Sequence, residues 1–186
     1  METFTELKEL VDNPNYHEQR QRSLADLDMD TIDRPIVGVV KGFMGLPYCF
    51  TLQSCYGHFL HRKRRDLYHT EPLPIADDIT KVKYRIAYIA LCVENSEQGR
   101  RLLLDLAEMP AIDRDYIQFG CAEWFWKRQV NSYALQVEPG RHMLEDKITV
   151  GYREALHIER VRNQFFDKLR GLLQTRSRGT ESGRAR

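Results

Sequence analysis

Residues 48–59, which read YCFTLQSCYGHF, constrain the fold of this chain more than any other segment. Side chains in the first half alternate between the two sides, as they do in a β-strand. The second half brings a hydroxyl, a thiol, a flexible backbone point and an imidazole within five positions, at Ser54, Cys55, Gly57 and His58. A strand that ends in such groups delivers reactive side chains to the edge of a sheet, where binding sites are often built.

The composition is that of an ordinary globular protein. The chain has 186 residues, 42% of them hydrophobic and 30% charged, which is enough for one sizeable core. No run approaches the ~18 apolar residues that a membrane-spanning helix needs. The acidic, polar start METFTELKEL is unlike a signal peptide. The four cysteines, Cys49, Cys55, Cys92 and Cys121, show no C-x-x-C spacing. We therefore expect reduced thiols and a cytoplasmic protein.

Basic charge is concentrated in two short stretches, although the net charge is only +1. One follows the strand directly, at Arg62, Lys63, Arg64 and Arg65, and the other is the tail that begins at residue 175. Such stretches are often solvated loops or disordered ends. They are also typical of strips that hold RNA phosphates, and both interpretations remain open at this point.

The spacing of apolar residues predicts three helices before the strand, at residues 4–11, 16–28 and 36–43. Asp33 is the expected N-cap of the third helix. Gly38 and Gly42 would lie one turn apart on that helix and would allow another backbone to approach closely, at a helix-propensity cost of about 1 kcal/mol each.

After the basic stretch, residues 81–93 read as one long strand. The next helix is expected to begin at Asn95 or Ser96 and to stop at Pro110. Two further strands and a last helix follow, at residues 116–120, 132–137 and 152–173.

This order predicts an α+β protein. We expect residues 1–174 to form a single α+β domain with a mixed β-sheet flanked by helices and with a long C-terminal helix. Residues 175–186 are low in apolar residues and are expected to be a disordered basic tail.

Cys55 and His58 have the chemistry of a nucleophile and its base, because a neighbouring imidazole can take the thiol proton. On an extended strand, however, residues three apart point to opposite faces, so the turn at Gly57 would have to redirect His58. Cys55, His58, His61 and His69 are also conceivable zinc ligands, but no second cluster with ligand spacing completes such a site. We assign no metal site from the sequence and leave open whether these four side chains converge.

The block from Glu123 to Arg128 places Trp124 and Trp126 beside two cations. Such a surface could stack a base and hold its phosphate. The alternative is a hairpin whose aromatic side chains pack on the final helix. The sequence has no G-x-G-x-x-G after a strand and no P-loop, which argues against a Rossmann-type methyltransferase or dehydrogenase.

The segment Thr51-Leu52-Gln53-Ser54-Cys55-Tyr56-Gly57-His58 resembles the T-x-S-S-C-S-G-R motif of the wybutosine-synthesis tRNA methyltransferases, the third protein of that pathway in archaea and eukaryotes. Ile32-Asp33 matches the "ID" step that precedes the motif in that family. The later strand, helix, hairpin and long helix fall in the family's order. Three motif positions differ from the family, at Gln53, Tyr56 and His58.

The resemblance implies a fold that binds S-adenosylmethionine without a glycine-rich loop and methylates a modified guanosine of tRNA. The implied cofactor-binding residues are Thr51, Ser54, Cys55 and Gly57. We expect Ser54, Cys55 and His58 to be the catalytic residues, of which Ser54 and Cys55 match the family's motif and His58 stands where the family has an arginine. The expected partner is tRNA or a nucleoside-like small molecule, bound by the basic stretch together with Trp124 and Trp126.

Two other functions stay open. The first is a non-catalytic small-molecule-binding protein on the same fold, because three motif residues have changed. The second is an RNA or protein interaction module that uses the basic stretch and the tryptophans.

Overall fold

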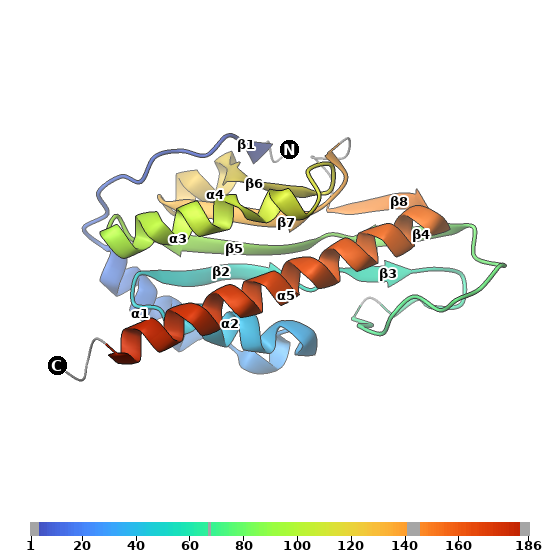
Figure 1. The fold of residues 1–186 in the computed structure, drawn as a ribbon, viewed down its shortest axis with the longest axis horizontal. Helices are drawn as coiled ribbons and strands as arrows, with labels where there is room; N and C mark the ends of the chain where they lie inside the picture. The colour runs from blue at the N-terminus through green and yellow to red at the C-terminus, as the bar shows by residue number, and fades with distance from the viewer. Residues whose placement is uncertain (1–3, 67, 141–145, 183–186) are drawn as a thin grey trace.

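Two antiparallel sheets form the frame of the protein in the part that the computed structural model describes, residues 4–66, 68–140 and 146–182. The larger sheet has the strand order β1 (Phe4–Thr5), β6 (Ile117–Ala122), β7 (Ser132–Val137), β5 (Ala87–Val93) and β2 (Cys49–Cys55). The smaller sheet has the order β3 (His58–Leu60), β4 (Lys81–Arg85) and β8 (Lys147–Gly151). Since one or two residues separate β2 from β3 and β4 from β5, the two sheets lie end to end (Figure 1).

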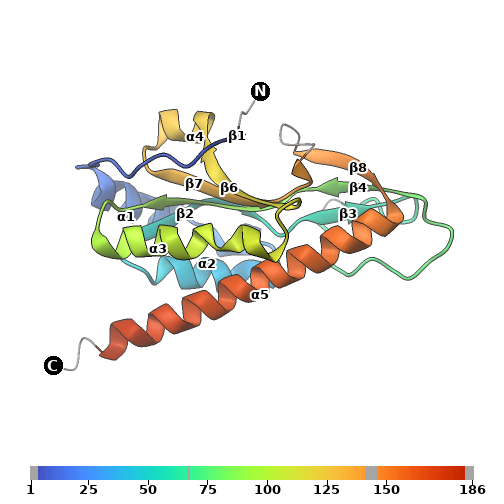
Figure 2. The same cartoon turned by 45° about the horizontal axis from the view of Figure 1, so that its top comes forward.

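Helices cover the larger sheet on both faces. The face with the main core packs against α2 (Val37–Met44), α3 (Glu97–Ala107) and α5 (Tyr152–Ser182), as Figure 2 shows. The other face packs against α1 (Tyr16–Asp26), whose Tyr16 forms a separate buried cluster with Phe50 and Cys92. The remaining short helices are η1 (Met29–Thr31), η2 (Arg34–Ile36), η3 (Met109–Ile112) and α4 (Glu123–Arg128).

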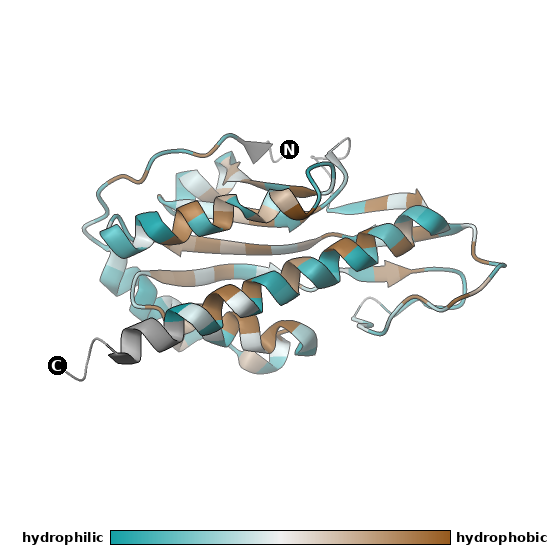
Figure 3. Ribbon diagram, viewed as in Figure 1, coloured by the Kyte–Doolittle hydropathy of each residue, from teal (hydrophilic) through white to brown (hydrophobic). Residues whose placement is uncertain are grey.

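The long helix α5 joins the two sheets into one domain. It crosses the face of both sheets in Figure 1 and contacts β4, β7 and β8. Its buried residues follow the three- and four-residue spacing of one helix face: Ala155, Ile158, Val161, Phe165, Leu169 and Leu173. Figure 3 shows hydrophilic residues between these apolar ones along the outer surface of α5. No helix in the described residues is long and apolar enough to cross a membrane.

The α+β class, the single domain and the long C-terminal helix are confirmed. The sheet differs in one respect, since every strand pairing in the described residues is antiparallel rather than mixed. The predicted strand 81–93 is divided at Ile86, whose N–H donates to the carbonyl of Asp146 instead of continuing a ladder within either sheet. The final helix runs to Ser182, so residues 175–182 of the expected disordered tail are helical. Residues 183–186 lie outside the described residues.

The helix predicted at residues 4–11 is wrong. Phe4 and Thr5 form β1, and the chain then continues without regular structure along the edge of the larger sheet. The side chains of Asn131 and Tyr133 bind this segment through the backbone of Val11 and Lys8, at distances of 2.8–2.9 Å. These long-range hydrogen bonds satisfy backbone groups that a helix would otherwise pair internally.

The two glycines of α2 differ in their surroundings. A Cβ added at Gly42 would lie 2.9 Å from Cδ1 and 3.1 Å from Cβ of Leu173 on α5, whereas a Cβ at Gly38 meets nothing within 4 Å. Only Gly42 therefore serves the close helix packing that the sequence suggests for both.

This difference predicts opposite effects of the same substitution. Gly38→Ala should raise the free energy of unfolding by roughly 0.5–1 kcal/mol, because alanine is the better helix former at an open position. Gly42→Ala should lose this gain or be destabilising, because α2 and α5 would have to separate. Urea unfolding of the two variants tests the packing, and an equal stabilisation by both would contradict it.

Candidate functional site

The turn between β2 and β3 brings Cys55 and His58 together. Gly57 interrupts the strand with a φ of 89°, a left-handed conformation that residues with a side chain rarely adopt. A Cβ at this position would lie 2.8 Å from the Cβ of Ala87. Glycine is therefore required for the turn that redirects His58 toward Cys55.

Asp33 completes a buried cluster with these two residues. The polar atoms of Asp33, Cys55 and His58 all lie within 4.8 Å of one another. Oδ2 of Asp33 lies 3.2 Å from Nε2 of His58 and accepts a hydrogen bond of 2.8 Å from the backbone N–H of Tyr56. Asp33 lies at the N-cap position of η2, which leads directly into α2, but its side chain makes no cap hydrogen bond. Its carboxylate serves the turn instead.

Both ring nitrogens of His58 face acceptors. Nδ1 lies 3.0 Å from the carbonyl oxygen of His69, and Nε2 faces the carboxylate of Asp33. In the absence of a metal, each nitrogen must then carry a hydrogen, and the ring is an imidazolium. Burial acts to lower the pKa of His58, but its hydrogen bonds to Asp33, to Cys55 and to the His69 carbonyl outweigh this and raise the pKa to about 10.

The same interactions act on the carboxylate. Burial acts to raise the pKa of Asp33, whereas the hydrogen bonds from His58 and from the Tyr56 backbone lower it, and the net shift is downward. The metal-free cluster is therefore a buried ion pair. In this state His58 offers no lone pair to take a proton from Cys55, so the geometry does not favour a nucleophile–base pair.

Arg162 of α5 also supports the turn. Its side chain is 2% exposed, and its Nη1 donates a hydrogen bond of 2.9 Å to the carbonyl of Gly57. The guanidinium carbon lies 4.0 Å from the ring centroid of Tyr56 and 5.0 Å from that of Phe59. Nη2 forms an ion pair of 3.6 Å with Glu159. Arg162 was not found from the sequence, because it lies 105 residues from the glycine it binds and has no motif around it.

The residues that the resemblance assigns to the cofactor have different surroundings. Thr51 is 6% exposed and Cys55 is 3% exposed, so both lie inside the fold. Ser54 is half-buried, and its hydroxyl makes no hydrogen bond within the described residues. Among these residues, Ser54 is therefore the one whose polar group is open to a ligand, while Gly57 shapes the turn.

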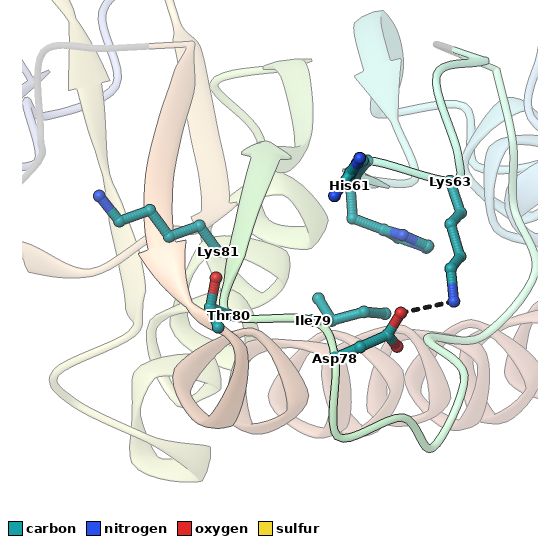
Figure 4. A pocket seen from close by; sticks show the side chains of 7 residues that line it. His61, Lys63, Asp78, Ile79, Thr80 and Lys81 are labelled. Atoms are coloured by element: carbon teal, nitrogen blue, oxygen red, sulfur yellow. Dashed lines mark ion pairs between the residues drawn. The ribbon is translucent and has the colours of Figure 1, made fainter.

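The basic stretch lines two hollows beside β3 and β4. One has a volume of about 540 Å³ and is drawn in Figure 4. It is lined by His61, Arg62, Lys63, Asp78, Ile79, Thr80 and Lys81. The second has a volume of about 410 Å³ and shares His61, Arg62 and Lys81 with the first, adding Arg64, Arg65 and Lys83. The two hollows are named the cationic hollows below.

The cations around the hollows fall into two groups. Lys63 forms an ion pair of 2.5 Å with Asp78, as Figure 4 shows, and Arg64 donates to the carbonyls of Glu71 and Pro72. The remaining four cations that line the hollows form no ion pair within the described residues. They are named the unpaired cations below and are Arg62, Arg65, Lys81 and Lys83. The structure therefore gives Lys63 and Arg64 internal partners and leaves a positive surface formed by cations from two neighbouring segments.

The tryptophans lie away from this surface. Trp124 and Trp126 belong to α4, which precedes β7 at the end of the larger sheet opposite β3, and both views separate α4 from the smaller sheet (Figures 1 and 2). Trp126 packs edge-on against Tyr133 of β7, at 5.8 Å between ring centroids, rather than on the final helix. The expected single surface of basic residues and tryptophans is thus divided in two.

The four conceivable metal ligands do not all converge. Among the described residues, the one group of metal-ligating side chains contains Cys55 and His58, with Asp33 as the third member. His69 contributes its backbone carbonyl, and His61 lies at the cationic hollows, where neither of its ring nitrogens has a hydrogen-bond partner in the described part of the chain. Burial, and then the nearby Arg64 and Lys63, lower the pKa of His61.

Comparisons with known proteins give little further information. No family model matches the chain, and no curated protein matches it. Among solved structures, the chain is similar to the PH1069 protein from Pyrococcus horikoshii, with a TM-score of 0.49 and 11% sequence identity over 89% of this chain and 95% of that one. A likeness of this degree carries no conclusion about function.

Proposed function

We propose that this protein is an S-adenosylmethionine-dependent methyltransferase-like protein that acts on RNA or on a modified nucleoside, related to the wybutosine-synthesis tRNA methyltransferases. One observation carries the proposal. The two separate parts of the sequence pattern, Ile32-Asp33 and the segment from Thr51 to His58, meet through the contacts of Asp33 with the Tyr56 N–H and with His58. A site built from residues of separate segments needs such contacts to bring its side chains into a common geometry.

Methyl transfer does not require an elaborate set of acid–base groups. Bound S-adenosylmethionine supplies an activated methyl group, and the protein has to position it against the acceptor and exclude water. Ser54 supplies an open hydroxyl for the cofactor, and Thr51 and Cys55 hold the end of β2 from inside. The ion pair of His58 and Asp33 fixes the turn that follows. The buried free thiols agree with a reducing, cytoplasmic location.

The cationic hollows support RNA as the acceptor. Arg62, Arg65, Lys81 and Lys83 offer charge that no acidic side chain in the described residues neutralises. RNA phosphates are a partner that such a surface attracts. The hollows begin at Leu60, the last residue of the strand that starts with His58, and at the next residue, His61.

Calorimetric titration with S-adenosylmethionine and S-adenosylhomocysteine tests the proposal. We expect dissociation constants on the order of micromolar for the wild-type protein and an affinity reduced by up to about 10-fold in Ser54→Ala, because one hydrogen bond is lost. Ser132→Ala is the matched control, since the Ser132 hydroxyl is buried on β7 without a hydrogen-bond partner in the described residues. No heat with the folded wild-type protein would reject the methyltransferase proposal.

A second candidate is a non-catalytic RNA-binding protein. The four unpaired cations favour it, because they do not require a cofactor. Binding of RNA by a protein that binds neither S-adenosylmethionine nor S-adenosylhomocysteine would identify this alternative.

A further inference from the structure

Three side chains with the chemistry of zinc ligands meet at the turn between the two sheets. Asp33 comes from the end of the loop before η2, Cys55 ends β2 and His58 begins β3. Their polar atoms lie within 4.8 Å of one another. The 3.2 Å between Asp33 Oδ2 and His58 Nε2 is close to the ~3.3 Å that separates two ligands of a tetrahedral zinc ion with bonds of about 2.0 Å.

The surrounding groups hold these side chains in the orientation that metal ligands have. The Nδ1–H of His58 donates to the His69 carbonyl, which aims Nε2 at the carboxylate. The carboxylate of Asp33 is itself held by the backbone N–H of Tyr56. Metal-bound histidines generally donate their second ring N–H to a carbonyl or carboxylate in this way, and metal-bound carboxylates are generally hydrogen-bonded.

We propose that Asp33, Cys55 and His58 bind one zinc ion. The ion takes the place of the proton between His58 and Asp33 and also displaces the thiol proton of Cys55, and both protons pass to the solvent. The carboxylate and the thiolate then balance its two charges inside the fold. A thiolate and an imidazole select zinc over magnesium or calcium.

The site has three protein ligands, which leaves a fourth position for water or another ligand, as in catalytic zinc sites. The side chain of Asp33 is 15% exposed, compared with 1% for that of His58. The inference does not depend on methyltransferase activity, because it concerns the metal content of the protein whether or not S-adenosylmethionine binds.

Cobalt substitution of the full-length, chelator-treated protein tests the site. We expect a thiolate-to-cobalt charge-transfer band and intense visible bands of a tetrahedral ion, which saturate at about one cobalt per chain and disappear when zinc is added. Cys55→Ala should lose the charge-transfer band, and Asp33→Asn should lower the cobalt affinity by more than about 100-fold. Cys121→Ala is the matched control, because Cys121 is equally buried and lies outside the cluster.

Circular dichroism of each variant establishes that it is folded. If Cys55→Ala does not fold, Cys55→Ser replaces it and should bind cobalt without the charge-transfer band. A folded wild-type protein that gives no bands would overturn the proposal. Bands that persist in the folded Cys55 variant would also overturn it, because the sulfur would then come from another cysteine.

Discussion

Replacing Arg162 with alanine is expected to lower the free energy of unfolding by about 3–5 kcal/mol. The guanidinium is 2% exposed and binds the Gly57 carbonyl, so its removal leaves a buried acceptor without a donor. It also leaves Glu159 without its cation and empties the space beside the rings of Tyr56 and Phe59. Equilibrium unfolding in urea, followed by circular dichroism, measures the loss.

Arg153 is the matched control on the same helix. Its side chain is exposed and makes no ion pair in the described residues, so Arg153→Ala should change the unfolding free energy by less than about 0.5 kcal/mol. Arg162→Lys should fall between the two, because lysine keeps the charge but loses the planar stacking on Tyr56. Equal stabilities of the Arg162→Ala and Arg153→Ala proteins would show that α5 does not hold the turn.

The local elements of this fold could be predicted because their causes are local. The alternation before Ser54 predicts a strand, and β2 is one. Ser96 predicts the start of a helix, and its hydroxyl does accept the N–H of Gly99 at the beginning of α3. The spacing of apolar residues after residue 152 predicts the long helix α5, because residues three and four apart lie on one face of a helix and that face is buried here.

The site could be predicted only in part, because its causes lie far apart in the sequence. Cys55, Gly57 and His58 were found from their motif, which is continuous. Asp33 is indicated both by the resemblance and as a helix cap, but neither predicts its contact with His58. A carboxylate before a helix gives the same local pattern whether it caps the helix or faces a histidine 25 residues later. No local pattern indicates Arg162, because a buried arginine on an amphipathic helix reads as a solvent-facing charge.

The division of the basic residues from the tryptophans has the same origin. The sequence does not show which end of the sheet the block with Trp124 and Trp126 occupies. The antiparallel strand order places α4, which carries this block, and β3 at opposite ends. If RNA binds at the cationic hollows, it therefore binds through charge from neighbouring segments rather than by stacking on Trp124 and Trp126. This distinction gives the RNA proposal its sharpest test.

Reversing the four unpaired cations, as Arg62→Glu, Arg65→Glu, Lys81→Glu and Lys83→Glu together, should lower the affinity for RNA by more than about 100-fold. The slope of log affinity against log salt concentration should fall by about 3, because each phosphate contact to a single strand contributes about 0.7. Fluorescence anisotropy with a labelled tRNA and a labelled single-stranded oligonucleotide, over a series of salt concentrations, measures both quantities. Trp124→Ala should leave the affinity within about twofold, because the tryptophan lies outside this surface.

A second fourfold reversal separates a binding surface from general electrostatic attraction. Arg22, Lys41, Lys127 and Lys168 are exposed, line neither hollow and give the same change in net charge when each becomes glutamate. If the hollows hold the phosphates, this control variant keeps most of the slope of log affinity against log salt concentration, whereas the first variant loses about 3 of it. The reason is that local contacts release counterions, whereas distant charges are screened within about 10 Å at 0.1 M salt. Equal losses in the two variants would mean that RNA is attracted by overall charge alone.

Asp78→Asn tests the same surface in the opposite direction. It frees Lys63 from its ion pair and should strengthen RNA binding at the hollow that both residues line.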